Sequence, residues 1–241
     1  MARLKLMFSH LSLQLLLVFS LFAWAVIIIG EDWYLLWLAP VGLLAQMLNE
    51  YSIHRYLFHW PAPKSQFWFD VLYRVHYGHH DFPDNRELLF VPVWFAIPMA
   101  IVNLALFWGA LTLIGFAQPF AGALSITFIG GVTTFIFYEW FHMTAHTNVK
   151  KFAIERHVTR LHGAHHFRDF TKSYHVNPGG IVIDKLMGTA IDQAKLKQKG
   201  RIQFLTTLGL KPNDARLLSA RSRFASYYGI SEQEVVRAAR T

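Results

Sequence analysis

The sequence contains no cysteine among its 241 residues. This absence excludes disulfide bonds, thiolate metal ligands and cysteine nucleophiles. Charged residues are also scarce, because Asp, Glu, Lys and Arg make up 16% of the chain, whereas they form about a quarter of an average protein. Hydrophobic residues reach 54%, which favours a small membrane bundle over an ordinary soluble domain.

Basic residues are missing from two long stretches, one between Lys5 and Arg55 and one between Arg86 and Lys150. The net charge of +8 is therefore concentrated outside them, and its placement argues against a nucleic-acid partner. The two stretches contain four apolar segments, each about the twenty residues or more that cross a bilayer. These predicted spans are about 11–30, 33–53, 88–116 and 117–141.

The first apolar segment follows a basic start, as a signal peptide does. Its apolar run is longer than usual and no A-x-A cleavage site follows, so it is predicted to be a retained helix. Four spans place every Lys and Arg on one side of the membrane, which the positive-inside rule identifies as the cytoplasm. We expect a multi-pass integral membrane protein whose histidine groups lie at the cytoplasmic face.

The predicted fold is all-α: a four-helix transmembrane bundle with a cytoplasmic helical cap that carries a histidine-rich dinuclear metal site. The membrane domain is expected to comprise residues 1–190, with metal-site segments at 54–87 and 142–190. A cytoplasmic helical tail follows at 191–241. In the tail we predict a helix at about 213–227 and another that opens with a capping box between Ser231 and Glu234.

Histidine is concentrated in four groups with the spacings H-x4-H, H-x2-H-H, H-x3-H and H-x2-H-H. Their members are His54, His59, His76, His79, His80, His142, His146, His162, His165 and His166. Positions i, i+3 and i+4 share one face of a helix, so each H-x2-H-H group is predicted to aim three imidazoles the same way. The H-x4-H step does not fit an α-helix, and we expect the helix to end or distort there.

Ten converging imidazoles are too many for one metal ion, which takes four to six ligands. Two ions with about five ligands each is the natural division. Imidazole suits iron, zinc, copper and nickel, so the ligand type does not name the metal. His10 stands alone and is assigned an ordinary interfacial role, whereas His157 and His175 lie near the groups and are candidate ligands or neighbours of ligands.

Two acidic residues precede histidines by about one helical turn. Glu50 lies four residues before His54, and Glu139 lies three residues before His142. Each carboxylate is placed to accept the spare N–H of a ligand imidazole or of a neighbouring one, and to lower the charge of two divalent ions. The alternative is an interfacial Glu that is hydrated by lipid headgroups.

With these four groups the chain resembles the fatty acid hydroxylase/sterol desaturase superfamily of integral-membrane di-iron oxygenases over about residues 45–190. The stretches "HYGHHDFPDNRELLFVPV", "YEWFHMTAH" and "DKLMGT" are most similar to the fatty acid 2-hydroxylase branch. The resemblance implies that the ten histidines bind two iron ions, with zinc possible in purified protein. It also implies that O2 is the co-substrate, that a lipid, most often a fatty acyl chain, is hydroxylated, and that electrons come from an outside donor.

Two features depart from that branch. "HVNPGG", His175 to Gly180, lacks the His-Pro step of a fused cytochrome b5 domain, so the electrons are expected from a separate cytochrome b5-like or ferredoxin-type protein. The same segment replaces the usual sequence after the last histidine group, so His175 and Asn177 are expected to shape the pocket differently. Aromatic residues near the groups have two possible roles, either lining a slot for an acyl chain or anchoring the chain at the interface: Trp60, Phe67, Trp68, Trp140 and Phe141.

The spacing of the histidines leaves other functions open. A desaturase, or a hydroxylase of a sterol, carotenoid or ether lipid, would use the same metal ligands. A metal transporter would need polar residues inside the spans, and the middles of these spans have no ionisable residue. A zinc hydrolase is disfavoured because there is no H-E-x-x-H motif.

Overall fold

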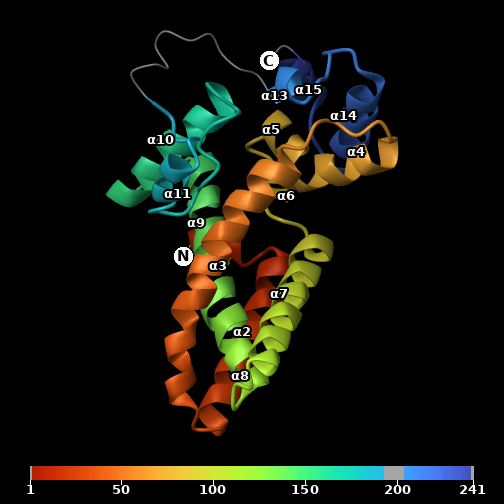
Figure 1. The fold of residues 1–241 in the computed structure, drawn as a ribbon. Helices are drawn as coiled ribbons and strands as arrows, with labels where there is room; N and C mark the ends of the chain where they lie inside the picture. The colour runs from red at the N-terminus through yellow and green to blue at the C-terminus, as the bar shows by residue number, and fades with distance from the viewer. Residues whose placement is uncertain (1, 193–203, 240–241) are drawn as a thin grey trace. The chain divides into compact units, whose positions relative to one another are not determined.

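The computed structural model describes residues 2–192 and 204–239, which form helices, turns and loops without a β-strand (Figure 1). The chain forms two compact units. Unit 1 comprises Met1–Asn49 and Val91–Trp140, and unit 2 comprises Glu50–Phe90 and Phe141–Thr241. The all-helical prediction is confirmed for the described residues. The predicted start of the tail at 191 borders residues 193–203, which lie outside the described part of the chain.

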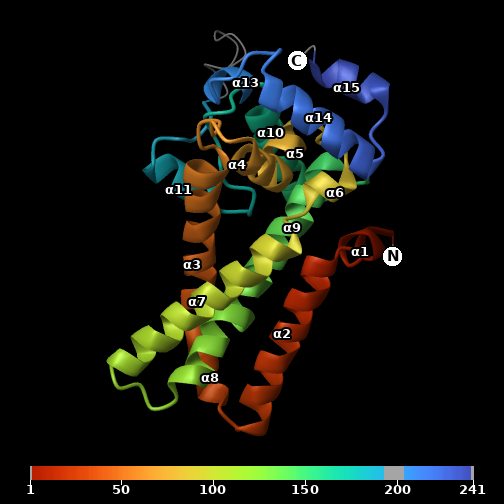
Figure 2. The same ribbon diagram turned by 90° about the vertical axis from the view of Figure 1, so that its right-hand side faces the viewer.

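Unit 1 is built from long apolar helices that run lengthwise beside one another (Figures 1 and 2). Two of the helices, α3 and α9, continue at their C-terminal ends into unit 2. The elements are α1 (Ala2–Met7), α2 (Leu11–Ile29), the 3-10 segment η1 (Trp33–Leu38), α3 (Ala39–Ser52), α7 (Val93–Leu113), α8 (Pro119–Leu124), the π-helical segment η4 (Ser125–Val132) and α9 (Thr133–His146).

Among the residues that the structure describes, three helices are long and apolar enough to cross a membrane: Leu11–Ile29, Arg86–Leu113 and Pro119–His146. They correspond to the first, third and fourth predicted spans. The second predicted span, 33–53, is not among them; it consists of the 3-10 segment η1 and the 14-residue α-helix α3, which carries the polar residues Gln46, Asn49 and Glu50. At 1.5 Å per residue that α-helix is about 21 Å long, against about 30 Å of hydrocarbon.

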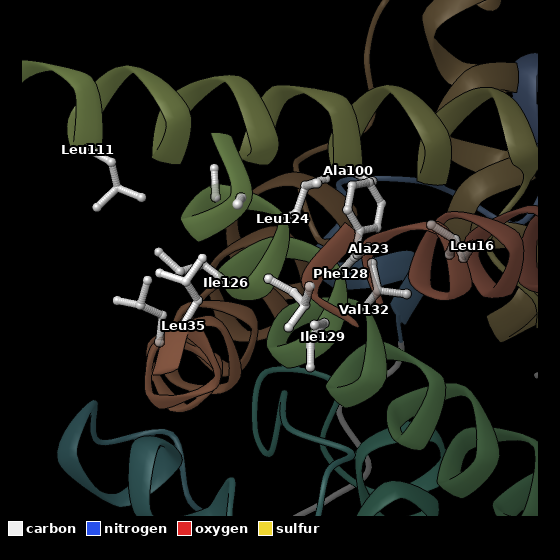
Figure 3. Packing of buried hydrophobic residues seen from close by; sticks show 14 of the residues in the cluster. Leu16, Ala23, Leu35, Ala100, Leu111, Leu124, Ile126, Phe128, Ile129 and Val132 are labelled. Carbon is white, nitrogen blue, oxygen red and sulfur yellow. The ribbon is translucent and has the colours of Figure 1, made fainter. Parts of the chain in front are cut away.

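A hydrophobic core fills the space between the helices of unit 1. Figure 3 shows Ala23 of α2, Ala100 of α7 and Phe128 of η4 directed toward one another within this cluster. The hydroxyl of Ser125, which is buried in this core, donates to the carbonyl oxygen of Leu35 at 2.8 Å. Small and apolar side chains let the helices pack closely.

Glycines set the closest approach between α3 and η4. A Cβ atom added to Gly130 would lie 2.0 Å from the carbonyl oxygen of Ala39, and one added to Gly42 would lie 1.8 Å from that of Ile126. Both neighbours are backbone atoms, which cannot rotate away. The backbones thus meet where only hydrogen side chains fit.

Gly130→Ala is expected to destabilise unit 1, because the added methyl group overlaps the backbone of α3. Overpacking of this kind costs about 1–3 kcal/mol or more. Gly109→Ala in α7 is the matched control, since a Cβ there meets no atom within 4 Å. The measurement is the thermal midpoint of both detergent-solubilised variants, and equal midpoints would refute a close contact between α3 and η4.

Unit 2 contains shorter helices around a second hydrophobic core. They are the π-helical segment η2 (Ile53–Phe58), α4 (Gln66–Leu72), the π-helical segment η3 (Tyr73–Tyr77), α5 (Gly78–Asp81), α6 (Arg86–Leu89), α10 (Ala153–Phe167), α11 (Ile181–Leu186), α13 (Phe204–Thr207), α14 (Ala215–Tyr228) and α15 (Glu232–Ala239). Leu217 of α14 is fully buried in this core with Phe69 of α4. The C-terminal helices are therefore integral to the packing of unit 2 (Figure 2).

Both predicted helices of the tail are confirmed. The first, predicted at about 213–227, is α14, and the second is α15. The capping box forms as predicted: the backbone N–H of Ser231 donates to Glu234 Oε2 at 2.9 Å, and the N–H of Glu234 donates to Ser231 Oγ at 3.4 Å.

Candidate metal centre

All ten histidines of the four sequence groups belong to unit 2, and their ring nitrogens form two clusters. In each cluster one nitrogen per residue lies within 4.8 Å of all the others. Cluster A contains His54, His59, His76, His80 and His165. Cluster B contains His79, His142, His146, His162 and His166. The structure thus brings together all ten histidines of the four groups and divides them five and five.

The H-x4-H pair meets in cluster A because the helix changes its winding. Residues Ile53–Phe58 form a π-helical turn, and the N–H of His59 donates to the carbonyl oxygen of His54 at 3.1 Å. A five-residue hydrogen bond is the mark of a π-helix, which places residues i and i+5 on one face. The predicted distortion is confirmed, and the helix ends at His59.

Each H-x2-H-H group supplies both clusters. His76 and His80 join cluster A while His79 joins cluster B, so the prediction that all three aim the same way is wrong. His76 belongs to the π-helical segment η3, and His79 and His80 belong to α5, so the group is not one regular α-helix. Even on a regular α-helix, at 100° per residue, positions i and i+4 lie 40° apart, whereas i+3 lies on the other side of i.

The second H-x2-H-H group divides in the opposite sense. His162 and His166 join cluster B, and His165 joins cluster A. Each cluster therefore receives two histidines from a pair, two from one H-x2-H-H group and one from the other. The clusters are adjacent, since the rings of His80 and His166 stack with centroids 4.0 Å apart.

Backbone carbonyls orient two of the imidazoles. His54 Nδ1 lies 2.5 Å from the carbonyl oxygen of Tyr174, and His165 Nδ1 lies 2.7 Å from that of Lys172. A carbonyl oxygen only accepts, so Nδ1 carries the proton and Nε2 presents its lone pair. Both Nε2 atoms are buried without a hydrogen-bond partner in the described part of the chain. This is the state in which histidine ligates a metal.

Burial keeps these imidazoles neutral. Desolvation, together with the charge of neighbouring histidines, lowers the pKa of His54 to about 3 and that of His165 to about 4. The same causes hold the pKa of His79 and His162 well below the usual range. Because ligation requires the unprotonated ring, the donor set fits a metal ion. Five donors in each of two sets fall within the four to six ligands that one metal ion takes.

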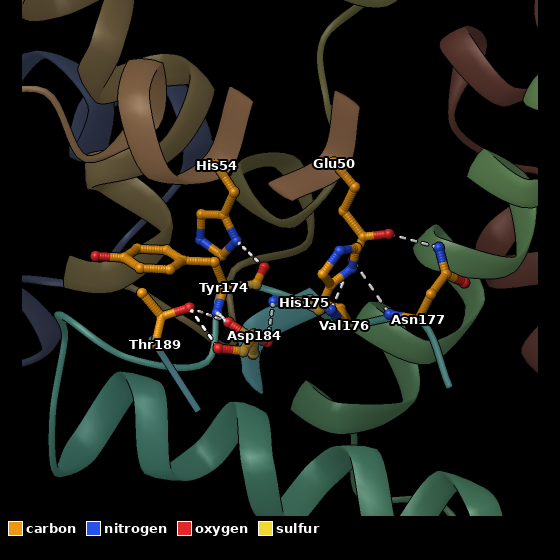
Figure 4. Close-up of polar contacts among 8 residues, drawn as sticks. All are labelled: Glu50, His54, Tyr174, His175, Val176, Asn177, Asp184 and Thr189. Carbon is orange, nitrogen blue, oxygen red and sulfur yellow. Dashed lines mark hydrogen bonds and ion pairs between the residues drawn. The ribbon is translucent and has the colours of Figure 1, made fainter. Parts of the chain in front are cut away.

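Glu50 contacts the segment that follows the last histidine group. Its Oε1 accepts from the N–H of Val176 at 2.6 Å and lies 3.1 Å from His175 Nδ1, and its Oε2 accepts from Asn177 Nδ2 at 2.6 Å (Figure 4). Burial lowers the pKa of His175, but the Glu50 carboxylate outweighs this effect and the pKa is raised. A Cβ on Gly180 would lie 2.3 Å from His175 Cγ, so a glycine is needed beside that ring.

Asp184 of α11 fixes the same segment from the other side. Its carboxylate accepts from the N–H groups of Tyr174 at 3.1 Å and His175 at 3.2 Å, and from Thr189 Oγ1 at 2.8 Å (Figure 4). The carbonyl of Tyr174 is thereby held where it meets His54. Residues Glu50 and Asp184 together fix the loop that orients a histidine of cluster A.

The remaining candidates lie outside the two clusters. His10 Nδ1 lies 2.7 Å from Ser12 Oγ, and His157 is exposed on α10. His175 is buried but belongs to neither cluster, and it contacts Glu50 instead. In unit 1, Glu139 is buried, and its Oε1 accepts from the N–H of Val91 at 3.2 Å.

The aromatic candidates differ in exposure. Trp60, Phe67 and Trp68 are each more than half exposed, which suits interfacial anchoring better than the lining of an acyl slot. Phe141, in contrast, is buried, and Trp140 is half-buried.

Sequence reasoning missed the groups that hold the histidines in place. Asp81 directly follows His80 and binds Arg221 of α14 in a buried ion pair, with Asp81 Oδ1 at 2.7 Å from Arg221 Nη2. The acidic residue next to a histidine group was a usable signal, as was Asp184 in "DKLMGT". The partner Arg221, 140 residues away, has no local signal.

The fatty acid hydroxylase family model matches residues 39–189, which include all ten histidines. The chain belongs to the fatty acid hydroxylase family. It is 31% identical over 151 residues to a dihydroceramide fatty acyl 2-hydroxylase of Arabidopsis thaliana, covering 61% of this chain and 58% of that one. It is 32% identical over 135 residues to a fatty acid 2-hydroxylase of Rattus norvegicus, covering 55% of this chain and 34% of that one.

The match thus spans between about a third and somewhat over half of these relatives. A solved structure of Scs7p, in which only the hydroxylase domain is visible, has a TM-score of 0.57 to this chain. The alignment is 23% identical and covers 75% of this chain and 64% of that one, so it supports the likeness of fold alone.

Stability of the metal-free protein is expected to fall as pH falls. An unfolded histidine has a pKa of about 6.5. Since the folded-state pKa of His54 and His165 is lower, the unfolded chain binds more protons below pH 6.5, and stability present above that pH is lost as pH falls toward about 4. The thermal midpoint in detergent at a series of pH values tests this.

In that experiment the paired variant His54→Ala/His165→Ala should show a flatter pH dependence than the parent protein. His10→Ala should keep the parent slope. A midpoint of the parent that stays constant from pH 7.5 to 4.5 would contradict the buried neutral histidines.

Proposed function

We propose that this chain is an O2-dependent membrane hydroxylase that oxidises a C–H bond of a lipid, with a fatty acyl chain as the substrate. The observation that carries the proposal is the convergence of ten imidazoles, eight of them buried and two half-buried, into two sets of five. The family and the names of the relatives, which are fatty acyl and fatty acid 2-hydroxylases, support a lipid substrate. The overall reaction combines R–H, O2, two electrons and two protons to give R–OH and H2O.

Clusters A and B would each hold one metal ion, and iron is the proposed metal. When bound, an iron pair supplies the redox chemistry that activates O2. Zinc in a purified sample would be compatible with the same ligands, because an all-imidazole site accepts it readily. The two electrons are proposed to come from a separate cytochrome b5-like or ferredoxin-type protein.

The residues of the chain position the ligands and exclude water. The carbonyls of Tyr174 and Lys172 hold His54 and His165 with Nε2 directed into cluster A. The carboxylate of Glu50 is proposed to act through the 174–177 segment, while Glu139, one turn before His142 on α9, is proposed to lower the charge near cluster B. Burial of the rings keeps bulk water from competing for their lone pairs.

The proposed membrane arrangement has four crossings. The 3-10 segment η1 adds about 12 Å to the about 21 Å of α3, at about 2.0 Å and 1.5 Å per residue, so that 33–53 reaches about the thickness of the hydrocarbon. Four crossings, with all Lys and Arg at the ends, would place the histidine clusters at the cytoplasmic face. Residues 1–190 would then be the hydroxylase domain and 191–241 a cytoplasmic tail.

Metal analysis and lipid mass spectrometry test the proposal together. Protein produced with iron supplied is expected to contain about two iron ions per chain, and cells that make it should accumulate a lipid whose mass is higher by about 16, one oxygen atom. A lipid lighter by about two hydrogens would instead identify a desaturase. No bound metal would refute the proposed centre, and metal without any new lipid would favour a metal-binding protein.

Single histidine variants test which residues are needed for metal binding and for hydroxylation. His79→Ala and His165→Ala remove a ligand from clusters B and A respectively, and each is expected to lose hydroxylation and to lower the metal content. His10→Ala, whose imidazole contacts Ser12 outside the clusters, should change neither. Full turnover by His79→Ala would show that the reaction does not need an intact cluster B. The measurements are product per cell and metal per purified chain.

A further inference from the structure

A buried ion pair joins helix α14, near the C-terminus, to the residue that follows the first H-x2-H-H group. Arg221 Nε donates to Asp81 Oδ2 at 2.9 Å, and Arg221 Nη2 donates to Asp81 Oδ1 at 2.7 Å. The hydroxyl of Tyr73 donates to the same Oδ2 at 2.7 Å. The side chains of Arg221 and Asp81 are 1% and 0% exposed, so the pair is shielded from water and salt.

Stability alone does not account for such a pair. Removing two charges from water costs about as much as their attraction returns, and apolar residues of similar size often serve equally well. What a bidentate guanidinium–carboxylate pair provides is a fixed geometry. The question is then which part of the molecule needs that geometry at Asp81.

Asp81 is the last residue of α5, the single helical turn that carries His79 and His80. These consecutive residues enter different clusters, His79 cluster B and His80 cluster A. A shift of this turn would therefore move one ligand of each cluster at once. The ion pair fixes the turn at its C-terminal end, and the Nη2 of Arg221 also donates to the carbonyl of Ala238 in α15 at 3.1 Å.

We propose that Arg221 is a positioning residue which, by clamping Asp81, sets the places of His79 and His80 and thereby couples the geometry of both clusters to helix α14. This inference rests on the proposed two-metal centre. Arg221 lies beyond residues 39–189, the part of the chain that the family model matches. Helix α14 thus becomes part of the metal centre although it supplies no ligand.

The test uses the full-length chain, stripped of metal with a chelator and titrated with Co²⁺, whose visible absorption responds to the number and arrangement of ligands. The parent protein is expected to bind two ions. Arg221→Gln should weaken both binding steps at least tenfold and change the absorption of the bound cobalt. His54→Ala and His146→Ala, each of which alters one cluster, should affect one ion each.

Arg223→Gln is the matched control, because Arg223 lies on the same helix and its guanidinium pairs with Asp70, away from α5. It should titrate as the parent does. A purely structural role of Arg221 would lower the thermal midpoint but leave the cobalt spectrum and both affinities of the folded protein unchanged. That result would overturn the inference.

If Arg221→Gln does not fold, because it leaves Asp81 buried without its cation, the triple variant Tyr73→Phe/Asp81→Leu/Arg221→Met carries the test. It replaces the polar clamp by apolar side chains of similar size. If the triple variant folds and binds both Co²⁺ ions more weakly than the parent protein, the inference is supported. If it titrates as the parent does, the inference is overturned. A parent protein that binds no Co²⁺ at all would instead refute the two-metal centre, and the inference with it.

Discussion

Ten imidazoles, eight of them buried and two half-buried, lie next to one another in unit 2, and most of what surrounds them can be understood from that constraint. A buried lone pair without a partner costs free energy, and a buried imidazolium costs more. Neutral rings whose Nε2 atoms converge avoid the charge but leave the lone pairs to be satisfied. In His54 and His165, the Nδ1–H group donates to the carbonyl of Tyr174 or Lys172, and this hydrogen bond decides that Nε2 faces the cluster. A bound cation would satisfy the lone pairs of the converging nitrogens.

Helical winding distributes the histidines between the clusters. In both H-x2-H-H groups, i and i+4 join one cluster and i+3 joins the other, although the first group begins in the π-helical segment η3 and the second lies in the α-helix α10. The two groups do so in opposite senses, which yields equal clusters. The pair with the five-residue step would be misaligned on an α-helix, and the π-helical turn Ile53–Phe58 corrects it. Local departures from α-helical geometry are therefore part of the construction of the site.

Much of this was predictable from sequence because the signals were periodic. Spacing identified the ten histidines, and the absence of Lys and Arg located the three long apolar helices. The capping box at Ser231 marked the start of α15. The division of each H-x2-H-H group between the clusters was not predicted. The rule that i, i+3 and i+4 share one helix face treats i+3 and i+4 alike, whereas these two histidines join different clusters. The 3-10 segment at Trp33–Leu38 also escaped prediction, because hydrophobicity alone does not distinguish it from an α-helix.

Contacts between residues distant in sequence mark the limit of such reasoning. Glu50 was singled out as a neighbour of His54, but it binds Val176, Asn177 and His175, more than 120 residues later. Asp81 was adjacent to the ligands in sequence, yet its cation comes from α14. In both cases a carboxylate next to a ligand binds a segment from elsewhere in the chain rather than the ligand itself. Segments from both ends of unit 2 therefore contact the residues next to the histidine clusters, and helices that contribute no histidine to the clusters pack into the same core.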